Sequence, residues 1–158
     1  MTFAEIDAYS LSVFVHVSAV VVGFGATFAE SIMFPVAMKA GVRHLPYVHK
    51  LQLAINQRLA TPALAIVILT GLYQTSERWE WDVAWINATF VIVLVIGGLL
   101  GGYFIPADRR LAAQAERELA ETGEVSEDYL RQARREGMVG ALTGLLLITA
   151  VFLMVTKP

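Results

Sequence analysis

The sequence predicts an all-α protein, a four-helix transmembrane bundle in which helices three and four extend beyond the membrane as a cytoplasmic helical hairpin. Its 158 residues are 56% hydrophobic and 16% charged, with a mean hydropathy of +0.59. Ordinary soluble domains are about 45–50% apolar and about 25% charged. Four stretches lack Asp, Glu, Lys and Arg and together hold 84 positions, namely 8–29, 59–75, 83–107 and 137–156. Each is about long enough to cross ~30 Å of hydrocarbon as a helix.

The first two helices follow from the first two charge-free stretches. Helix one is expected over about 8–38, longer than a bilayer requires, so it tilts, bends near Pro35 or protrudes from the membrane. The segment 45–58 mixes apolar and polar residues and is expected at the interface, and the second span covers about 52–75. Pro62 lies in its first turns, where a proline kinks the helix or frees a backbone carbonyl.

The third helix is expected over about 83–105, with Asp82 as its N-cap and Pro106 near its end. It carries a row of small residues that matches a shorter row on the fourth helix. In lipid, such rows permit close approach between helices. We expect them to join helices three and four, with a homo-oligomer contact as the alternative. The glycines concerned are Gly97, Gly98, Gly101, Gly102, Gly137, Gly140 and Gly144.

The segment 106–136 is rich in Ala, Glu, Arg and Leu and is predicted to form the helical hairpin. Gly123 supplies its turn, and Ser126 caps the second helix, which continues without a breaker into the last span at about 137–156. The segment holds six Arg and eight acidic residues. This balance indicates a solvated, self-neutralising hairpin, with a docking surface for a partner as the alternative. The whole chain, 1–158, is expected to be one membrane domain.

The distribution of basic residues predicts the orientation. Ten of the twelve Lys and Arg lie in the first and third loops, and cytoplasmic loops carry the excess of such residues. Both termini are therefore expected outside, in a bacterial cytoplasmic (inner) membrane. Trp79, Trp81 and Trp85 cluster at the short second loop, as interfacial aromatic residues do.

Composition excludes several other classes of protein. The absence of cysteine removes disulfides, thiolate metal sites and iron–sulfur clusters. A formal net charge of −2 supplies no basic field, so the expected surroundings are the lipid bilayer and no nucleic acid. Because no Lys or Arg precedes the first apolar stretch, that stretch is expected to be a retained helix and no signal peptide.

Two ionisable residues lie within the first span, where each costs about 2.5–3.5 kcal/mol unless it is paired or hydrated. His16 and Glu30 are 14 residues apart, close to four turns, so they face nearly the same side at a separation of ~21 Å. Ala19, Gly23 and Thr27 lie close to the same line. Glu30 is expected either to form an intramembrane polar network with Arg58 or to act as a proton-carrying carboxylate or polar substrate site.

His16 is the histidine that lies inside a predicted span. A neutral imidazole can hydrogen-bond a neighbouring helix, or it can serve as an axial ligand of haem in the interior of a bundle. Met154 lies at a comparable depth and is a candidate second ligand, although a methionine that fills an apolar gap is the more common case.

A small basic patch is expected near the inner end of helix two, attracted to anionic lipid. The five-residue spacing of its two histidines places them on different faces of a helix, so no zinc site is predicted. The patch consists of Arg43, His44, His49 and Lys50.

Three segments together resemble a bacterial family of predicted four-helix integral membrane proteins of unknown function. They are FVHVSAVVVGFGA at 14–26, RLATPALAIVILTGLY at 58–73 and YFIPADRRL at 103–111. The plan is distantly similar to that of copper-resistance-D domains and HemJ-type protoporphyrinogen oxidases. For the latter, the resemblance implies haem b bound by the histidine of helix one, which is His16 here.

We therefore expect a small inner-membrane protein of unassigned activity whose polar stripe is structural or binds a small ligand. One alternative is a haem-binding membrane oxidoreductase of the HemJ type. A second is a small proton-linked carrier that acts as an oligomer. No residue is assigned a catalytic or metal-binding role.

Overall fold

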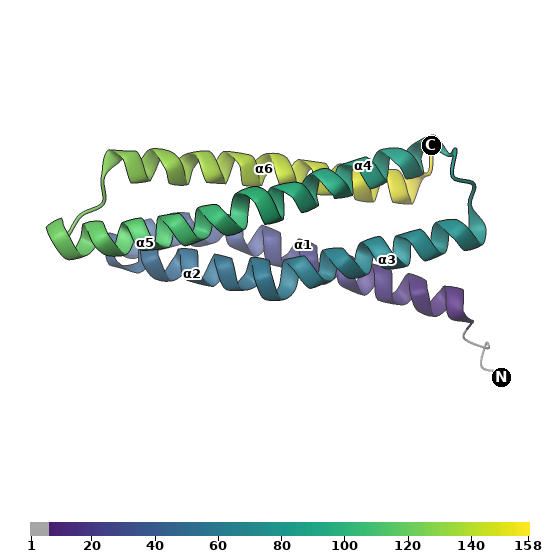
Figure 1. Cartoon of the computed structure of the whole chain (residues 1–158), viewed down its shortest axis with the longest axis horizontal. Coiled ribbons are helices and arrows are strands. Elements are labelled where there is room, and N and C mark those ends of the chain that lie inside the picture. The colour runs from purple at the N-terminus through teal and green to yellow at the C-terminus, as the bar shows by residue number, and fades with distance from the viewer. Residues whose placement is uncertain (1–6) are drawn as a thin grey trace.

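The computed structural model describes residues 7–158 as four long antiparallel helical rods (Figure 1). In chain order the elements are α1 (Ala8–Ala40), η1 (Val42–His44), α2 (Leu45–Ile55), η2 (Asn56–Ala60), α3 (Thr61–Arg78), α4 (Ala84–Leu99), η3 (Leu100–Phe104), α5 (Ile105–Thr122) and α6 (Glu127–Thr156). The second rod runs from η1 to α3, and the third from α4 to α5. Residues 7–158 contain no strand, so the predicted all-α four-helix class is confirmed.

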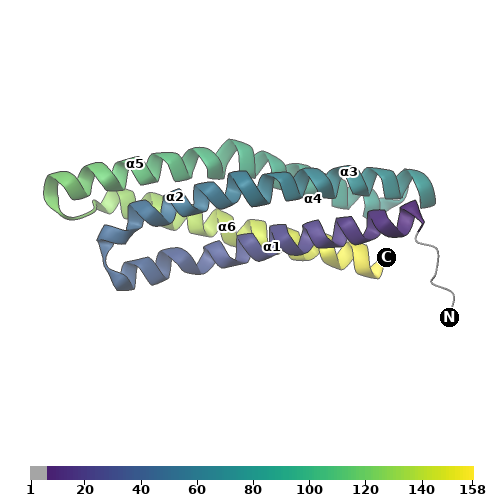
Figure 2. The same ribbon diagram turned by 90° about the horizontal axis from the view of Figure 1, so that it is seen from below.

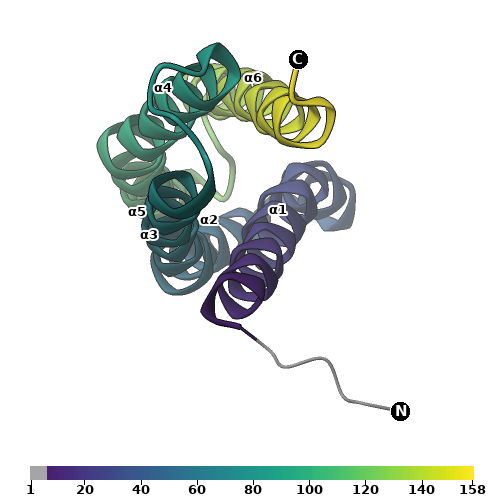
Figure 3. The ribbon, with the colours of Figure 1, turned by 90° about the vertical axis from the view of Figure 1, so that its right-hand side faces the viewer.

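The bundle has two different ends. One holds the C-terminus, the beginning of α1 and the loop at 79–83 (Figures 1 and 2), and we call it the terminal end. The other, which we call the hairpin end, holds the turns at 41–44 and 123–126. Viewed along the bundle the helices form a ring (Figure 3). Within it α1 packs along α3, α2 along α5 and α4 along α6, whereas α1 and α6 contact each other less.

The apolar core is concentrated at the hairpin end. Tyr129, Leu45 and Ala115 are fully buried there, and they pack with Ala37, Val48, Leu111 and Ala133. Along the rods, by contrast, large apolar side chains such as Phe14, Val21 and Leu94 point outward. This division matches the solvent expected at each level, because lipid provides no hydrophobic driving force between helices whereas water does.

Two π turns interrupt the rods, and each lies just before a proline. The π turn η2 precedes Pro62, and η3 precedes Pro106. A proline lacks the N–H group, and its ring clashes with the carbonyl four residues earlier, so a locally wider turn relieves the conflict. The hydroxyl of Thr61 donates to the Asn56 carbonyl at 2.7 Å. Pro62 thus disturbs the helix as predicted, and the disturbance takes the form of a π turn.

The predicted helix caps are confirmed in the hairpin and wrong at α4. The Tyr129 N–H donates to Ser126 Oγ at 3.1 Å, and Gly123 adopts the left-handed conformation with φ of 76°. The expected cap Asp82 instead lies in a turn, and α4 begins at Ala84 with Val83 as a residue that makes no side-chain cap.

Helices α4 and α6 pack along each other as expected, but a Cβ added at any of their glycines would meet no atom of the other helix within 4 Å. A Cβ added at Gly97 would lie 3.3 Å from Leu64 of α3. At Gly98, Gly101 and Gly102 it would meet no atom within 4 Å. That a second copy of the chain packs against these glycines stays a prediction.

Candidate functional site

A cavity of about 720 Å³ lies inside the bundle, between α1 and α6 and against α2, α3 and α4. Its volume is within the ~300–1,000 Å³ range typical of small-molecule sites. Along the rods its walls are apolar and include Phe24, Phe28, Val67, Ile96, Leu147 and Ile148. The cavity therefore offers a long apolar chamber at the depth where the helices are most hydrophobic.

Toward the hairpin end the wall of the cavity becomes polar. The residues that form this polar end come from all four rods, and they are Glu30, His49, Gln52, Asn56, Asp108 and Glu136. A cavity with an apolar chamber and one polar end has the shape and chemistry of a site for an amphipathic molecule.

The polar stripe on α1 faces the cavity. Ala19, Gly23, Thr27 and Glu30 line it, as their spacing predicts. His16 is buried, with 7% of its surface exposed, but it lies beyond the residues that line the cavity.

His16 instead joins α1 to α3. Its Nδ1 is 2.8 Å from the hydroxyl of Thr70, and a Cβ added at Gly71 would lie 3.6 Å from its ring. The geometry corresponds to the first alternative for this residue, a hydrogen bond to a neighbouring helix. Met154 lines the cavity from α6.

The structure does not bring Glu30 and Arg58 together. Arg58 is exposed and lines a separate hollow of about 320 Å³ between α1 and α3 with Phe14, Ser18 and Pro62. The charged neighbours of Glu30 are Asp108 and Glu136. The expected ion pair between Glu30 and Arg58 is therefore not formed. The π turn at 56–60 leaves Asn56 buried in the bundle and Arg58 on its surface.

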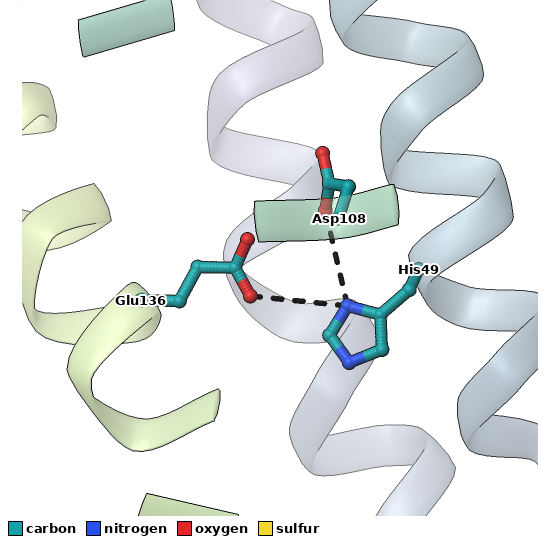
Figure 4. Close-up of side chains that lie close together, drawn as sticks. All are labelled: His49, Asp108 and Glu136. Carbon is teal, nitrogen blue, oxygen red and sulfur yellow. Dashed lines mark ion pairs between the residues drawn. The ribbon is translucent and has the colours of Figure 1, made fainter. Parts of the chain in front are cut away.

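A cluster of three side chains occupies the polar end of the cavity, drawn in Figure 4. His49 Nδ1 lies 3.8 Å from Asp108 Oδ1 and 3.8 Å from Glu136 Oε2. His49 and Asp108 are each 1% exposed and Glu136 is 8% exposed. The assignment of His49 to a basic surface patch is therefore wrong, and Asp108 and Glu136 are no part of the solvated hairpin surface.

Two further contacts orient this cluster. His49 Nε2 is 2.9 Å from the hydroxyl of Tyr129, and Asn56 Nδ2 donates to Asp108 Oδ2 at 3.0 Å. Both contacts use the atoms that point away from the centre. His49 Nδ1 and Asp108 Oδ1 consequently face each other, and His49 Nδ1 has no hydrogen-bond partner in residues 7–158.

The cluster escaped sequence reasoning because its members belong to three different rods and form no local motif. A signal was nevertheless present on each helix. Asp108 shares a helical face with Leu111, Ala112 and Ala115, and Glu136 shares one with Tyr129 and Ala133, so both carboxylates interrupt apolar faces. A charged residue on the buried face of an amphipathic helix is rarely tolerated without a partner.

Fold and cavity together define an integral membrane protein with four helices long and apolar enough to span a bilayer and a ligand-sized chamber between them. The chain matches the family described as predicted integral membrane protein (DUF2269) over residues 10–158 and belongs to that family. No curated protein and no solved structure shows significant similarity to it.

Proposed function

We propose that this protein binds a small amphipathic molecule within the bilayer, with a cationic or donor-rich head at the polar end of the cavity. One observation carries the proposal. Three buried atoms at that end can accept hydrogen bonds but have no partner in the described residues 7–158: Glu30 Oε1, His49 Nδ1 and Gln52 Oε1. Each unpaired buried acceptor costs about 1–3 kcal/mol, so a ligand that donates to these atoms gains that amount.

The balance of charge at the cavity favours a cationic head. Glu30, Asp108 and Glu136 supply three carboxylates, whereas Arg134 is the cationic side chain among the lining residues. The chamber is bounded by α1 and α6, which contact each other less than α1 and α3, α2 and α5 or α4 and α6 do. A molecule dissolved in the bilayer would reach the chamber from that side without crossing water.

The test compares long-chain amphiphiles of equal length in lipid nanodiscs that contain the whole protein. We expect a primary amine to bind more tightly than the alcohol and the alcohol more tightly than the carboxylate, measured by equilibrium dialysis. Gly140→Leu should weaken binding of the amine at least about tenfold, or ~1.4 kcal/mol. The reason is that Gly140 lines the cavity and a Cβ there meets no atom within 4 Å, so the side chain fills the chamber without a clash.

Gly98→Leu is the matched control, because Gly98 is exposed on α4, has the same open surroundings and does not line the cavity. It should bind the amine as the wild type does. Equal binding of the amine and the carboxylate, or wild-type binding by Gly140→Leu, would contradict the proposed function.

The haem alternative receives less support from the geometry, because His16 does not line the cavity. A Soret band after haem supplementation that disappears in His16→Ala would favour the oxidoreductase. For the carrier alternative, proton-linked flux into liposomes that is lost in Glu30→Gln would be the supporting result.

We also propose the inner-membrane orientation in which both termini lie outside. The excess of Lys and Arg in the first and third loops supports it. The chain contains no cysteine, so single cysteines report position without background. A membrane-impermeant maleimide is expected to label Glu80→Cys in intact spheroplasts. It should label Glu124→Cys only after the spheroplasts are lysed. The reverse pattern would overturn this orientation.

A further inference from the structure

We propose that His49, Asp108 and Glu136 form a binding site for a divalent transition-metal ion at the polar end of the cavity. The donor atoms are His49 Nδ1, Asp108 Oδ1 and Glu136 Oε2. One imidazole and two carboxylates suit zinc or iron, and three protein ligands leave positions open for water or another molecule. The inference goes beyond the proposed function and does not depend on a bound amphiphile.

The spacing of the donor atoms fits an ion of this class. Each carboxylate oxygen is 3.8 Å from the imidazole nitrogen, and one donor atom from each of the three residues lies within 4.8 Å of the others. Ligands about 2.1 Å from a tetrahedral ion lie ~3.4 Å apart. Each carboxylate oxygen would therefore have to approach the imidazole nitrogen by ~0.4 Å. Figure 4 shows one oxygen of each carboxylate directed toward the ring nitrogen of His49, with the three side chains coming from three helices.

The hydrogen bonds around the cluster orient its donor atoms toward a shared space. When the Nε2–H of His49 donates to the hydroxyl of Tyr129, at 2.9 Å, the Nδ1 lone pair points toward the carboxylate oxygens of Asp108 and Glu136. Three acceptors then face one another in a buried space. A metal-bound histidine is typically held in this way, with its second nitrogen bonded to a neighbouring group.

A positively charged His49 would stabilise the two carboxylates less well than a divalent ion would. Its Nδ1 lies 3.8 Å from both carboxylate oxygens, which is too long for a hydrogen bond. Buried ion pairs are stable only when hydrogen bonds accompany them. One imidazolium also carries a single positive charge against the two carboxylates of Asp108 and Glu136, whereas a divalent ion neutralises both.

The surroundings complete the site. Asn56 holds the second oxygen of Asp108 at 3.0 Å and thereby directs the first toward His49. With the ion bound, Glu30 and Gln52 still present unpaired oxygens to the cavity. A cationic head in the cavity would then pair with Glu30, the lining carboxylate outside the ligand group.

The test uses the full chain in detergent, without a polyhistidine tag, after removal of metal with EDTA. ZnCl₂ is titrated by calorimetry and CoCl₂ by visible absorption, which reports the coordination of cobalt. We expect one ion per chain. His49→Ala and Asp108→Asn should weaken binding more than about 100-fold, and Tyr129→Phe about 10–100-fold, as partners outside the ligand set do. Glu136→Gln should change the cobalt spectrum even where binding persists.

His44→Ala and Glu116→Gln are the matched controls, because both residues are exposed near the same end of the bundle. Both should bind as the wild type does, and so should Gly140→Leu, the variant expected to lose the amine. That pattern separates the two proposals. Folded wild-type protein that binds neither ion saturably, or binding that survives His49→Ala and is lost in His44→Ala, would overturn the metal site.

Discussion

Tyr129→Ala is expected to disrupt the hairpin end of the bundle and to lower the free energy of unfolding by about 3–5 kcal/mol. Tyr129 is fully buried in the core that α1, α2, α5 and α6 share. Its ring contacts the His49 ring edge to face, with centroids 5.9 Å apart. Truncation leaves a cavity where the ring was, and it leaves His49 Nε2 without its hydrogen-bond partner. Both losses fall in the apolar core at the hairpin end.

Unfolding by SDS or by heat in detergent measures this effect. Tyr47→Ala is the control, because Tyr47 lies at the same end of the molecule but is 68% exposed, and it should change stability by less than ~0.5 kcal/mol. Tyr129→Phe retains the ring and removes the hydroxyl, so it should cost about 1–3 kcal/mol. If Tyr129→Ala were no less stable than Tyr47→Ala, the hairpin core would not hold this end together.

Features that depend on residues close together in the sequence were predictable. The four rods follow from the lengths of the charge-free stretches. The hairpin turn follows from Gly123, because only glycine adopts a positive φ there without strain, and from the hydroxyl of Ser126 as a cap. The stripe of Ala19, Gly23 and Thr27 facing inward follows from the 3.6-residue period.

The pairing of Glu30 with Arg58 failed for a physical reason. Depth in the membrane can be counted along a helix, but the direction of a side chain also depends on every irregular turn before it. The π turn at 56–60 widens the helix at the residues in question, and Asn56 occupies the interior while Arg58 is exposed. Pro62 predicts that the helix is irregular here, but it does not predict that the irregularity is a π turn.

The cluster of His49, Asp108 and Glu136 required knowledge of how the rods pack. The sequence spacing relates His49 to His44, which ends η1 just before α2, whereas the partners of His49 lie on α5 and α6. The interruption of apolar faces by Asp108 and Glu136 shows that each is buried but not that they meet. Such contacts between rods are a property of the packed bundle.

Asp108→Leu alone is expected to cost about 3–5 kcal/mol, because it leaves His49 and Asn56 buried without the group they contact. Replacing the whole network with apolar residues should have the opposite outcome. Buried ionic networks are often neutral or less stable than well-packed apolar side chains, and the adjoining cavity can accept the added carbon atoms. The combined variant carries His49→Leu, Asn56→Leu, Asp108→Leu, Tyr129→Phe and Glu136→Met.

We expect this combined variant to unfold at or above the temperature of the wild type, so that the substitutions are strongly non-additive. It should also bind neither ZnCl₂ nor the long-chain amine. Stability retained while binding is lost would mean that Asp108 and its neighbours serve the ligand and are not required to hold the helices together. A combined variant as unstable as Asp108→Leu would instead assign the network a structural role. The two roles predict opposite changes in the unfolding temperature of the combined variant. Removing a network that serves a ligand relieves buried charge and keeps or raises that temperature. Removing a network that holds the helices together breaks the contact between three rods and lowers it.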